Sequence, residues 1–415
     1  MTSFVTRALI GATALVLVAA PAAAQQTLKI AYVDPLSGGM AATGESGLKT
    51  FQYLADEINA KGGVLGMKVE VVGYDNKLNA QESLVQVQKA IDAGIRIITQ
   101  GNGSAFAAAI EDFVGKYNDR NPGKEVIYFN YAAVDPVLTN EKCSYWHFRW
   151  DANSDIKMEA LTNYMKPRQD IKKIYLINQD YSFGQAVRAE ARKMIAAKRP
   201  DIQIVGDELH PLAKITDFSP YVAKIKAAGA DSVITGNWGA DFALLLKAAA
   251  DAGLKVDWYT YYAGGIGGPT AVKQANAGDH VFAIQEGVAN DPYKPAQEFE
   301  KAFRDKVGMT LYYPRAVNEM RMLVAAIEAA KSTDPGRIAQ QLEGMKINVY
   351  NDGEGFMRAD DHQFLQPMYI AQLGPLAAGQ PFDEEKTGWG WKVAAKVAAK
   401  DTVLPTTCKM SRPNM

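Results

Sequence analysis

The chain has 415 residues, with 45 basic and 46 acidic side chains and a formal net charge of −1 at pH 7. This balance gives no electrostatic footprint for nucleic acid or for an anionic membrane surface, so neither is expected as a partner. The length exceeds what one hydrophobic core comfortably supports, which favours two lobes.

Residues 1–24 have the pattern of a secretory signal peptide. Arg7 provides a positive charge, Ala8–Ala20 is an uninterrupted run of small and apolar residues, and Ala22–Ala24 matches an A-x-A cleavage site. The run is shorter than the about 20 residues that cross a bilayer, and no Cys follows it, so membrane and lipid anchors are disfavoured. An exported protein beginning near Gln25 is expected.

The chain contains two cysteines, Cys143 and Cys408. In an exported protein an even number of cysteines favours a disulfide over metal binding. The bond would tie residues 400–415, which have little apolar content, to the first lobe. The histidines are scattered without metal-ligand spacing, so neither a metal site nor a cofactor is expected.

Strand and helix patterns alternate through the first part of the mature chain. The opening unit is the strand Leu28–Val33, a loop of small residues at Asp34–Thr43, and a helix from Gly44 to Lys61. The strands that follow are Lys68–Gly73, Ile95–Thr99, Val126–Asn130 and His147–Trp150, with helices at Asn79–Ala93 and Ala105–Tyr117. Alternation at this period predicts parallel strand pairing in a doubly wound sheet.

The alternation starts again after the polar segment Asp151–Asp155. Strands are predicted at Lys173–Asn178, Ile202–Glu208, Ser232–Thr235 and Asp257–Tyr262, and helices at Met158–Met165, Gln185–Ala197, Phe218–Ala228 and Ala240–Ala252. Further helices are predicted at Ala296–Val307, Ala316–Ala330 and Pro335–Glu343, whereas Gly264–Gly268 is interpreted as a surface loop with no helix pattern behind it. The fold class is therefore α/β, with two doubly wound lobes.

The turn Gly101–Ser104 lies between a predicted strand and a predicted helix. A glycine-rich turn lets a ligand approach the backbone, and the free N–H groups of a helix N-terminus favour an anion. A dinucleotide site would need a third glycine where Phe106 or Ala107 stands, which disfavours it. A carboxylate-sized anion site and a plain N-cap at Ser104 both remain open, and the two can coexist.

Several short motifs together resemble one known family. They are Pro35–Gly38, Ile58–Gly63 with Gly66, Tyr74–Asp75, Asp135–Pro136 with Leu138–Thr139, and Asp180–Tyr181 before Gly184. In this order, behind a signal peptide, they resemble the type I periplasmic substrate-binding proteins of ABC importers, in the class that binds branched-chain or hydrophobic amino acids. The resemblance extends from about Leu28 to about Leu373.

This resemblance implies a domain plan of two Rossmann-like lobes joined by three crossovers, near Arg149–Asn153, Gln285–Asn290 and Asn348–Asp352. The first lobe would comprise residues 25–150 and 287–350. The second would comprise residues 151–286 and 351–390, including Asp352–His362, and residues 391–415 would form a C-terminal tail.

The resemblance also implies a ligand site between lobes that close by hinge bending. The ligand carboxylate would be held at Asn102, Gly103 and Ser104 and at Ala132, Ala133 and Val134, and the cleft would be lined by Thr43, Tyr181, Trp238 and Tyr262. Val134 replaces a usual hydroxyl, which leaves more of the binding to main-chain groups. Ala263 stands where amino acid binders place an acid for the ligand ammonium, and Glu286, near a crossover, is the candidate substitute for that acid.

The function expected from these features is binding, not catalysis. The sequence lacks a G-x-S-x-G nucleophile motif. We expect a periplasmic monomer that delivers a small carboxylate to an ABC transporter permease. With Ala263 at the ammonium position, the expected ligand is an aromatic or branched keto acid. A hydrophobic amino acid, with Glu286 as its partner, is the alternative ligand, and a periplasmic sensor domain is the alternative role.

Overall fold

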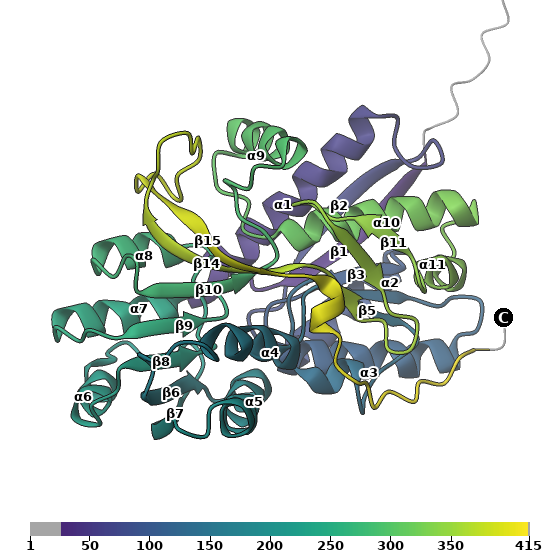
Figure 1. Ribbon diagram of the computed structural model, residues 1–415. Coiled ribbons are helices and arrows are strands. Elements are labelled where there is room, and N and C mark those ends of the chain that lie inside the picture. Colours follow the sequence, from purple (N-terminus) through teal and green to yellow (C-terminus); the bar gives the residue numbers. More distant parts are fainter. Residues whose placement is uncertain (1–25, 414–415) are drawn as a thin grey trace, which may run out of the picture.

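The computed structural model describes residues 26–413 and consists of two α/β lobes, each an open sheet flanked by helices (Figure 1). The predicted signal peptide lies outside the described residues. Within residues 26–413, no helix combines the length and the apolar content needed to cross a bilayer.

The first lobe is built on a five-stranded sheet in the order β2-β1-β3-β4-β5, in which every neighbouring pair is parallel. Its strands are β1 (Thr27–Asp34), β2 (Lys68–Asp75), β3 (Ile97–Gln100), β4 (Ile127–Asn130) and β5 (His147–Arg149). The short 3-10 segment η1 (Gly38–Met40) precedes α1 (Ala41–Ala60), and the other helices are α2 (Ala80–Asp92), α3 (Ser104–Arg120), α9 (Lys294–Val307), α10 (Pro314–Ala330) and α11 (Pro335–Leu342). The apolar strands β3 and β4 are buried along their whole length, as expected for parallel strands with both faces covered.

The second lobe is built on a seven-stranded sheet in the order β15-β14-β10-β9-β8-β6-β7. Its strands are β6 (Lys173–Gln179), β7 (Gln203–His210), β8 (Ser232–Thr235), β9 (Asp257–Thr260), β10 (Val281–Gln285), β14 (Met368–Pro375) and β15 (Trp389–Val397). The helices are α4 (Ser154–Met165), α5 (Ser182–Lys198), α6 (Ser219–Ala227), α7 (Gly239–Asp251) and α8 (Gly268–Gln274). The strands β6 to β10 pair in parallel, whereas β14 pairs antiparallel with both β10 and β15.

Two predictions for the second lobe were wrong. The glycine run leads directly into the helix α8, because Gly267 adopts a φ of +81° before the helix and Pro269 fits its first turn. The predicted tail, residues 391–415, begins inside the edge strand β15, whose Trp389 and Trp391 are buried against the sheet. Trp389 and Trp391 lie two positions apart, so their side chains point to the same face of the sheet.

A small antiparallel sheet lies where the chain returns from the first lobe to the second. It consists of β11 (Lys346–Asn348), β12 (Glu354–Met357) and β13 (Phe364–Leu365). Met357 and Phe364 belong to the apolar core of the first lobe, while Leu365 and Met368 belong to that of the second. Asp352–His362, which the resemblance assigned to the second lobe, therefore contacts both lobes, with Met357 in the first core and Phe356 packed against the second.

Cys143 and Cys408 form a disulfide, with their Cα atoms 5.7 Å apart. Beside it, the backbone N–H of Thr407 donates to Asn140, at a distance of 2.9 Å. These contacts hold the C-terminal segment against the first lobe.

Candidate functional site

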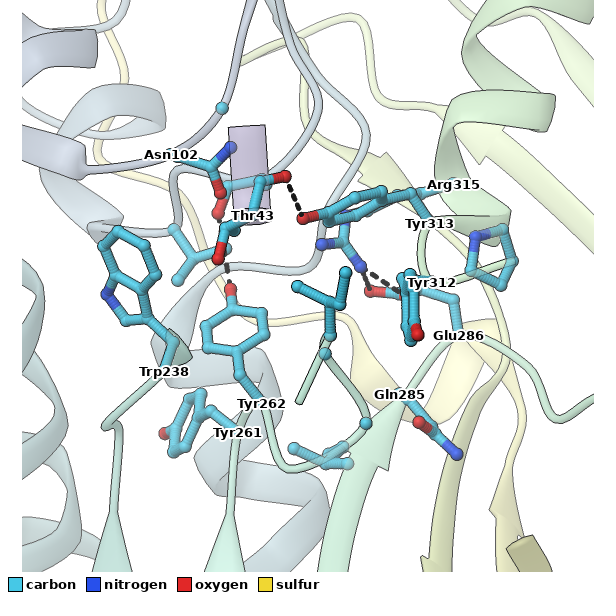
Figure 2. A pocket seen from close by; sticks show the side chains of 18 of the residues that line it. Thr43, Asn102, Trp238, Tyr261, Tyr262, Gln285, Glu286, Tyr312, Tyr313 and Arg315 are labelled. Atoms are coloured by element: carbon cyan, nitrogen blue, oxygen red, sulfur yellow. Dashed lines mark hydrogen bonds and ion pairs between the residues drawn. The ribbon is translucent and has the colours of Figure 1, made fainter. Parts of the chain in front are cut away.

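The carboxyl ends of the parallel strands of both sheets meet at one cavity between the lobes (Figure 2). Its walls include the segments that follow β3, β4, β8, β9 and β10. Ligands of open α/β sheets bind at such strand ends. The lobes also touch beside the cavity, where Met40 of the first lobe is buried in the apolar core of the second. The arrangement is therefore a closed one.

The start of α3 presents hydrogen-bond donors to this cavity. Gly103 has a φ of +101°, which glycine adopts without strain, and α3 begins at the next residue. Among the described residues, the backbone N–H groups of Ser104 and Val134 have no acceptor. Ser104 Oγ accepts the N–H of Asp135 at 3.1 Å, which leaves its own hydroxyl hydrogen free to donate. These donors, at the positive end of a helix dipole, suit a carboxylate.

Asp34, at the end of β1, fixes the turn that precedes α3. Its carboxylate accepts the backbone N–H groups of Gly101, at 3.3 Å, and Asn102, at 2.9 Å, and the hydroxyl of Tyr131 at 2.7 Å. Burial raises the pKa of Asp34 to about 6, although the hydrogen bonds from Tyr131 and Asn102 oppose the shift. Asp34 therefore fixes the conformation of the turn by accepting these two N–H groups. The N–H of Ser104, further along the turn, remains available to a ligand.

Aromatic side chains of the second lobe form the opposite wall. Trp238 and Tyr181 stand directly before α7 and α5, and Trp238 Nε1 donates to the Tyr181 hydroxyl at 2.9 Å. The Tyr262 hydroxyl, which lies 3.3 Å from Ala132 O, crosses to the first lobe (Figure 2). These rings offer flat apolar surface to the body of a ligand.

Four buried charged residues, Asp151, Lys157, Glu286 and Arg315, meet at the hinge side of the cavity. Arg315 Nη1 lies 3.0 and 2.9 Å from the two carboxylate oxygens of Glu286. Lys157 Nζ lies 2.7 Å from Asp151 Oδ1 and 3.6 Å from Glu286 Oε1. Arg315 belongs to α10 and Lys157 to α4, whereas Asp151 and Glu286 lie where the chain crosses between lobes. This charge cluster therefore joins both lobes and two of their connections.

The carboxylates of the charge cluster titrate differently. Burial raises the pKa of Asp151 to about 7, against the opposing attraction of Arg315 and Lys157. Burial also acts on Glu286, but there the two cations outweigh it and lower the pKa to about 2. Glu286 is thus an anion at neutral pH whose charge Arg315 already balances. The cluster is neutral overall when Asp151 is ionised.

The predicted site residues are largely brought together. Those that line the cavity are Thr43, Asn102, Gly103, Ser104, Ala132, Ala133, Val134, Tyr181, Trp238 and Tyr262. Thr43 lies in the first turn of α1 and not in the loop before it. Ala263 is the exception, because it is fully buried in the core of the second lobe beside α8. Its prediction as a lining residue was wrong.

Sequence reasoning missed Lys157 and Arg315, and also Tyr312 and Tyr313, which stand directly before α10 and line the cavity. The only local signal was a single charged residue in the otherwise apolar first turn of a helix, as at Arg315. In the part of the chain that the structure describes, no cluster of three or more His, Cys, Asp or Glu side chains is arranged to hold a metal ion.

Comparisons with known proteins agree with this geometry. The family described as periplasmic binding protein matches residues 27–380. "Leu/Ile/Val-binding protein homolog 4" of Brucella abortus (strain 2308) is 36% identical over 419 residues, which cover 96% of each chain. The crystal structure of a leucine-, isoleucine-, valine-, threonine-, and alanine-binding protein from Brucella ovis, in a closed conformation, has a TM-score of 0.83 at 32% identity and covers 94% of this chain and 100% of that one.

A solute binding protein of an ABC transporter from Rhodopseudomonas palustris HaA2, in complex with p-hydroxybenzoic acid, shares the fold. It has a TM-score of 0.76 at 20% identity, with 90% of this chain and 98% of that chain covered. The match of the family over residues 27–380, together with the Brucella relatives, identifies the chain: it belongs to the periplasmic binding protein family.

Proposed function

We propose that the protein captures a small carboxylate without an α-ammonium group, such as an aromatic or branched keto acid, and delivers it to an ABC transporter permease. The single observation that carries this proposal is a contrast within the cavity between hydrogen-bond donors that are free and a carboxylate that is already paired. The donors at Ser104 and Val134 are unused, whereas Glu286, an acid that lines the cavity, is already paired with Arg315.

The carboxylate of the ligand would lie at the start of α3. Three donors converge there, from the Ser104 N–H, the Ser104 hydroxyl and the Val134 N–H. Hydrogen bonds to a charged acceptor contribute about 1.5–3 kcal/mol each. The missing hydroxyl at Val134 is therefore compensated by main-chain donors.

An α-ammonium group would find the carboxylates that line the cavity already facing a cation, since Glu286 pairs with Arg315 and both Glu300 and Glu384 face Arg304. Glu286 could bind the ammonium only by giving up contacts with Arg315, and Asp151 faces Lys157 and Arg315. A buried charge left unpaired costs several kcal/mol. The expectation that Glu286 rescues an amino acid ligand is thus not supported by its surroundings.

The body of the ligand would lie against Trp238, Tyr181 and Tyr262. The Rhodopseudomonas palustris structures with p-hydroxybenzoic acid and with benzoate show that this fold accommodates aromatic acids. A hydrophobic amino acid remains the second candidate, because the Brucella relatives are named for leucine, isoleucine and valine.

Periplasmic location, a permease partner and action as a monomer complete the proposal. They are supported by the family membership and by the residue pattern of a signal peptide at residues 1–24.

A thermal-shift screen over amino acids, keto acids and aromatic acids tests the proposal. Compounds that bind only the folded state raise the melting temperature in proportion to the logarithm of their concentration over Kd. We expect the largest shifts from acids that lack an amine. Shifts from leucine or phenylalanine, with none from any of the acids, would overturn it.

A further inference from the structure

Lys157 is a buried donor only part of whose hydrogen-bonding capacity is used. The residue is fully buried and lines the cavity. Its ammonium lies 2.7 Å from Asp151 Oδ1 and 3.6 Å from Glu286 Oε1. An ammonium carries three N–H donors, and one close carboxylate oxygen occupies only part of that capacity. A ligand oxygen in the cavity can therefore accept a further hydrogen bond from Lys157.

The position of Lys157 connects this donor to the carboxylate site. Lys157 Nζ lies over the ring of Tyr262, 4.6 Å from its centroid. The hydroxyl of the same ring lies 3.3 Å from Ala132 O, on the loop that also carries the free N–H of Val134. The side chain of Tyr262 therefore contacts both Lys157 and the loop that would hold the ligand carboxylate.

We propose that Lys157 donates a hydrogen bond to an oxygen on the carbon next to the ligand carboxylate, so that the preferred ligand is a 2-oxo or 2-hydroxy acid. This inference rests on the proposed function, because it assumes a carboxylate at the start of α3.

The same position rejects a 2-amino acid. A ligand ammonium is stabilised by a carboxylate or by the face of an aromatic ring. Here the face of Tyr262 is already covered by the Lys157 ammonium, and Arg315 lies 6.0 Å from the same ring. Asp151 and Glu286 already face Lys157 and Arg315, so they leave no spare carboxylate for a third cation, whereas a ligand oxygen can accept a hydrogen bond from the ammonium.

Calorimetric titration of matched acids tests the inference. The aromatic set is phenylpyruvate, phenyllactate and 3-phenylpropanoate, and the branched set is 4-methyl-2-oxopentanoate and 4-methylpentanoate. Within each set only the oxygen next to the carboxylate changes. One hydrogen bond from a charged donor predicts that the oxygenated acid binds roughly 10- to 100-fold more tightly than the plain acid.

The double variant Lys157→Met/Asp151→Asn removes one positive and one negative charge together, so the balance of the charge cluster is kept. In this variant the ratio of the two affinities should fall to near one. The control Lys166→Met makes the same change at the exposed C-terminal end of α4 and should keep the wild-type ratio.

Failure of this inference is distinct from failure of the proposed function. Wild-type protein that binds plain and oxygenated acids equally overturns the role of Lys157 and leaves a carboxylate binder, with water satisfying the donor. Wild-type protein that binds none of the acids overturns the proposed function and this inference with it. The wild-type ratio decides the matter even where the double variant does not fold.

Discussion

The two polar walls of the cavity are built in different ways. The wall at the start of α3 is local, since Asn102 to Ser104 form one turn and Ala132 to Val134 another, and its donors are two main-chain N–H groups and the Ser104 hydroxyl. The charge cluster on the hinge side consists of side chains from four segments, and Lys157 and Arg315 are 158 positions apart in the numbering of the sequence.

This difference separates two roles. Main-chain N–H donors at a helix start are positioned by the fold itself. They can remain unpaired until a ligand binds, and the helix dipole favours an anion there. Buried side-chain charges cannot wait unpaired, so the charge cluster balances itself and leaves only hydrogen-bonding capacity to the ligand. The wall at the start of α3 determines that the ligand carries a carboxylate. The charge cluster determines which group the ligand can carry next to that carboxylate.

The largest effect is expected from breaking the charge cluster. Arg315→Met leaves Glu286 buried without its close partner, and removing one partner of a buried ion pair costs about 3–5 kcal/mol of unfolding free energy. The measurement is urea denaturation at neutral pH. As a control, Lys306→Met breaks an exposed pair with Asp56, which should change the unfolding free energy by at most about 1 kcal/mol. Equal effects of the two variants would contradict the role given to the charge cluster.

A change remote from both walls sharpens the comparison. Replacing Cys143 and Cys408 by Ser should lower the unfolding free energy by about 2–4 kcal/mol, because the disulfide closes a long loop in the unfolded chain. Ligand affinity should not change, because neither residue lines the cavity. Intact mass before and after reduction and alkylation checks the bond, and two free thiols in protein purified from the periplasm would show that it does not form.

Ser104→Ala removes one donor from the local wall and leaves the charge cluster untouched. Loss of one hydrogen bond to a carboxylate should weaken acid binding roughly tenfold, equivalent to about 1.4 kcal/mol. Ser219→Ala, at the exposed start of α6, serves as the matched control in calorimetry. An unchanged affinity in Ser104→Ala would place the carboxylate elsewhere.

The smallest effect concerns pH. Protonation of Asp151, with its pKa raised to about 7 by burial, gives the charge cluster a net positive charge beside Arg315, Lys157 and Glu286. Acid binding should therefore strengthen from about pH 8 to about pH 6, by at most about tenfold per pH unit for one coupled proton. Asp151→Asn should abolish this dependence. Asp155→Asn also removes a carboxyl whose pKa burial raises to about 7, but Asp155 makes no ion pair with Lys157 or Arg315, so this variant should keep the dependence.

The same shift fixes the sign of the stability change. Because the folded-state pKa of Asp151 lies above its ordinary value of 3.8, its protonated form favours folding. Its contribution to the unfolding free energy is complete below about pH 4 and is lost as the pH rises through about 7. Denaturation of Asp151→Asn should show a weaker decrease over this range than the wild type.

Most of the fold could be predicted from the sequence, because its strands and helices carry strong local patterns. The turn Gly101–Ser104 was visible for the same reason, since a strand, two glycines and a helix start are consecutive. The helix α8 was missed although Pro269 in its first turn is a start signal, and β15 was missed because its second half is exposed. Both elements were missed because their local patterns are short or incomplete.

The charge cluster could not be predicted in this way. Lys157 has Asp155 and Glu159 as its near neighbours in the sequence, where a charged face exposed to solvent is the ordinary expectation. Tertiary contacts with Asp151, Glu286 and the ring of Tyr262 bury it instead. Ala263 was misplaced for a related reason, since the tight path into α8 turns its side chain into the core. Glu286 does not replace the acid that is missing at Ala263, because its carboxylate is paired with Arg315.

The most direct test of the central claim is a pair of calorimetric titrations with phenylpyruvate and phenylalanine. The two ligands share the aromatic body and the carboxylate and differ only in the oxygen or ammonium beside it. An unpaired buried ammonium costs several kcal/mol, so phenylpyruvate should bind at least roughly a hundredfold more tightly. Phenylalanine binding as tightly as phenylpyruvate, or more tightly, would contradict the account.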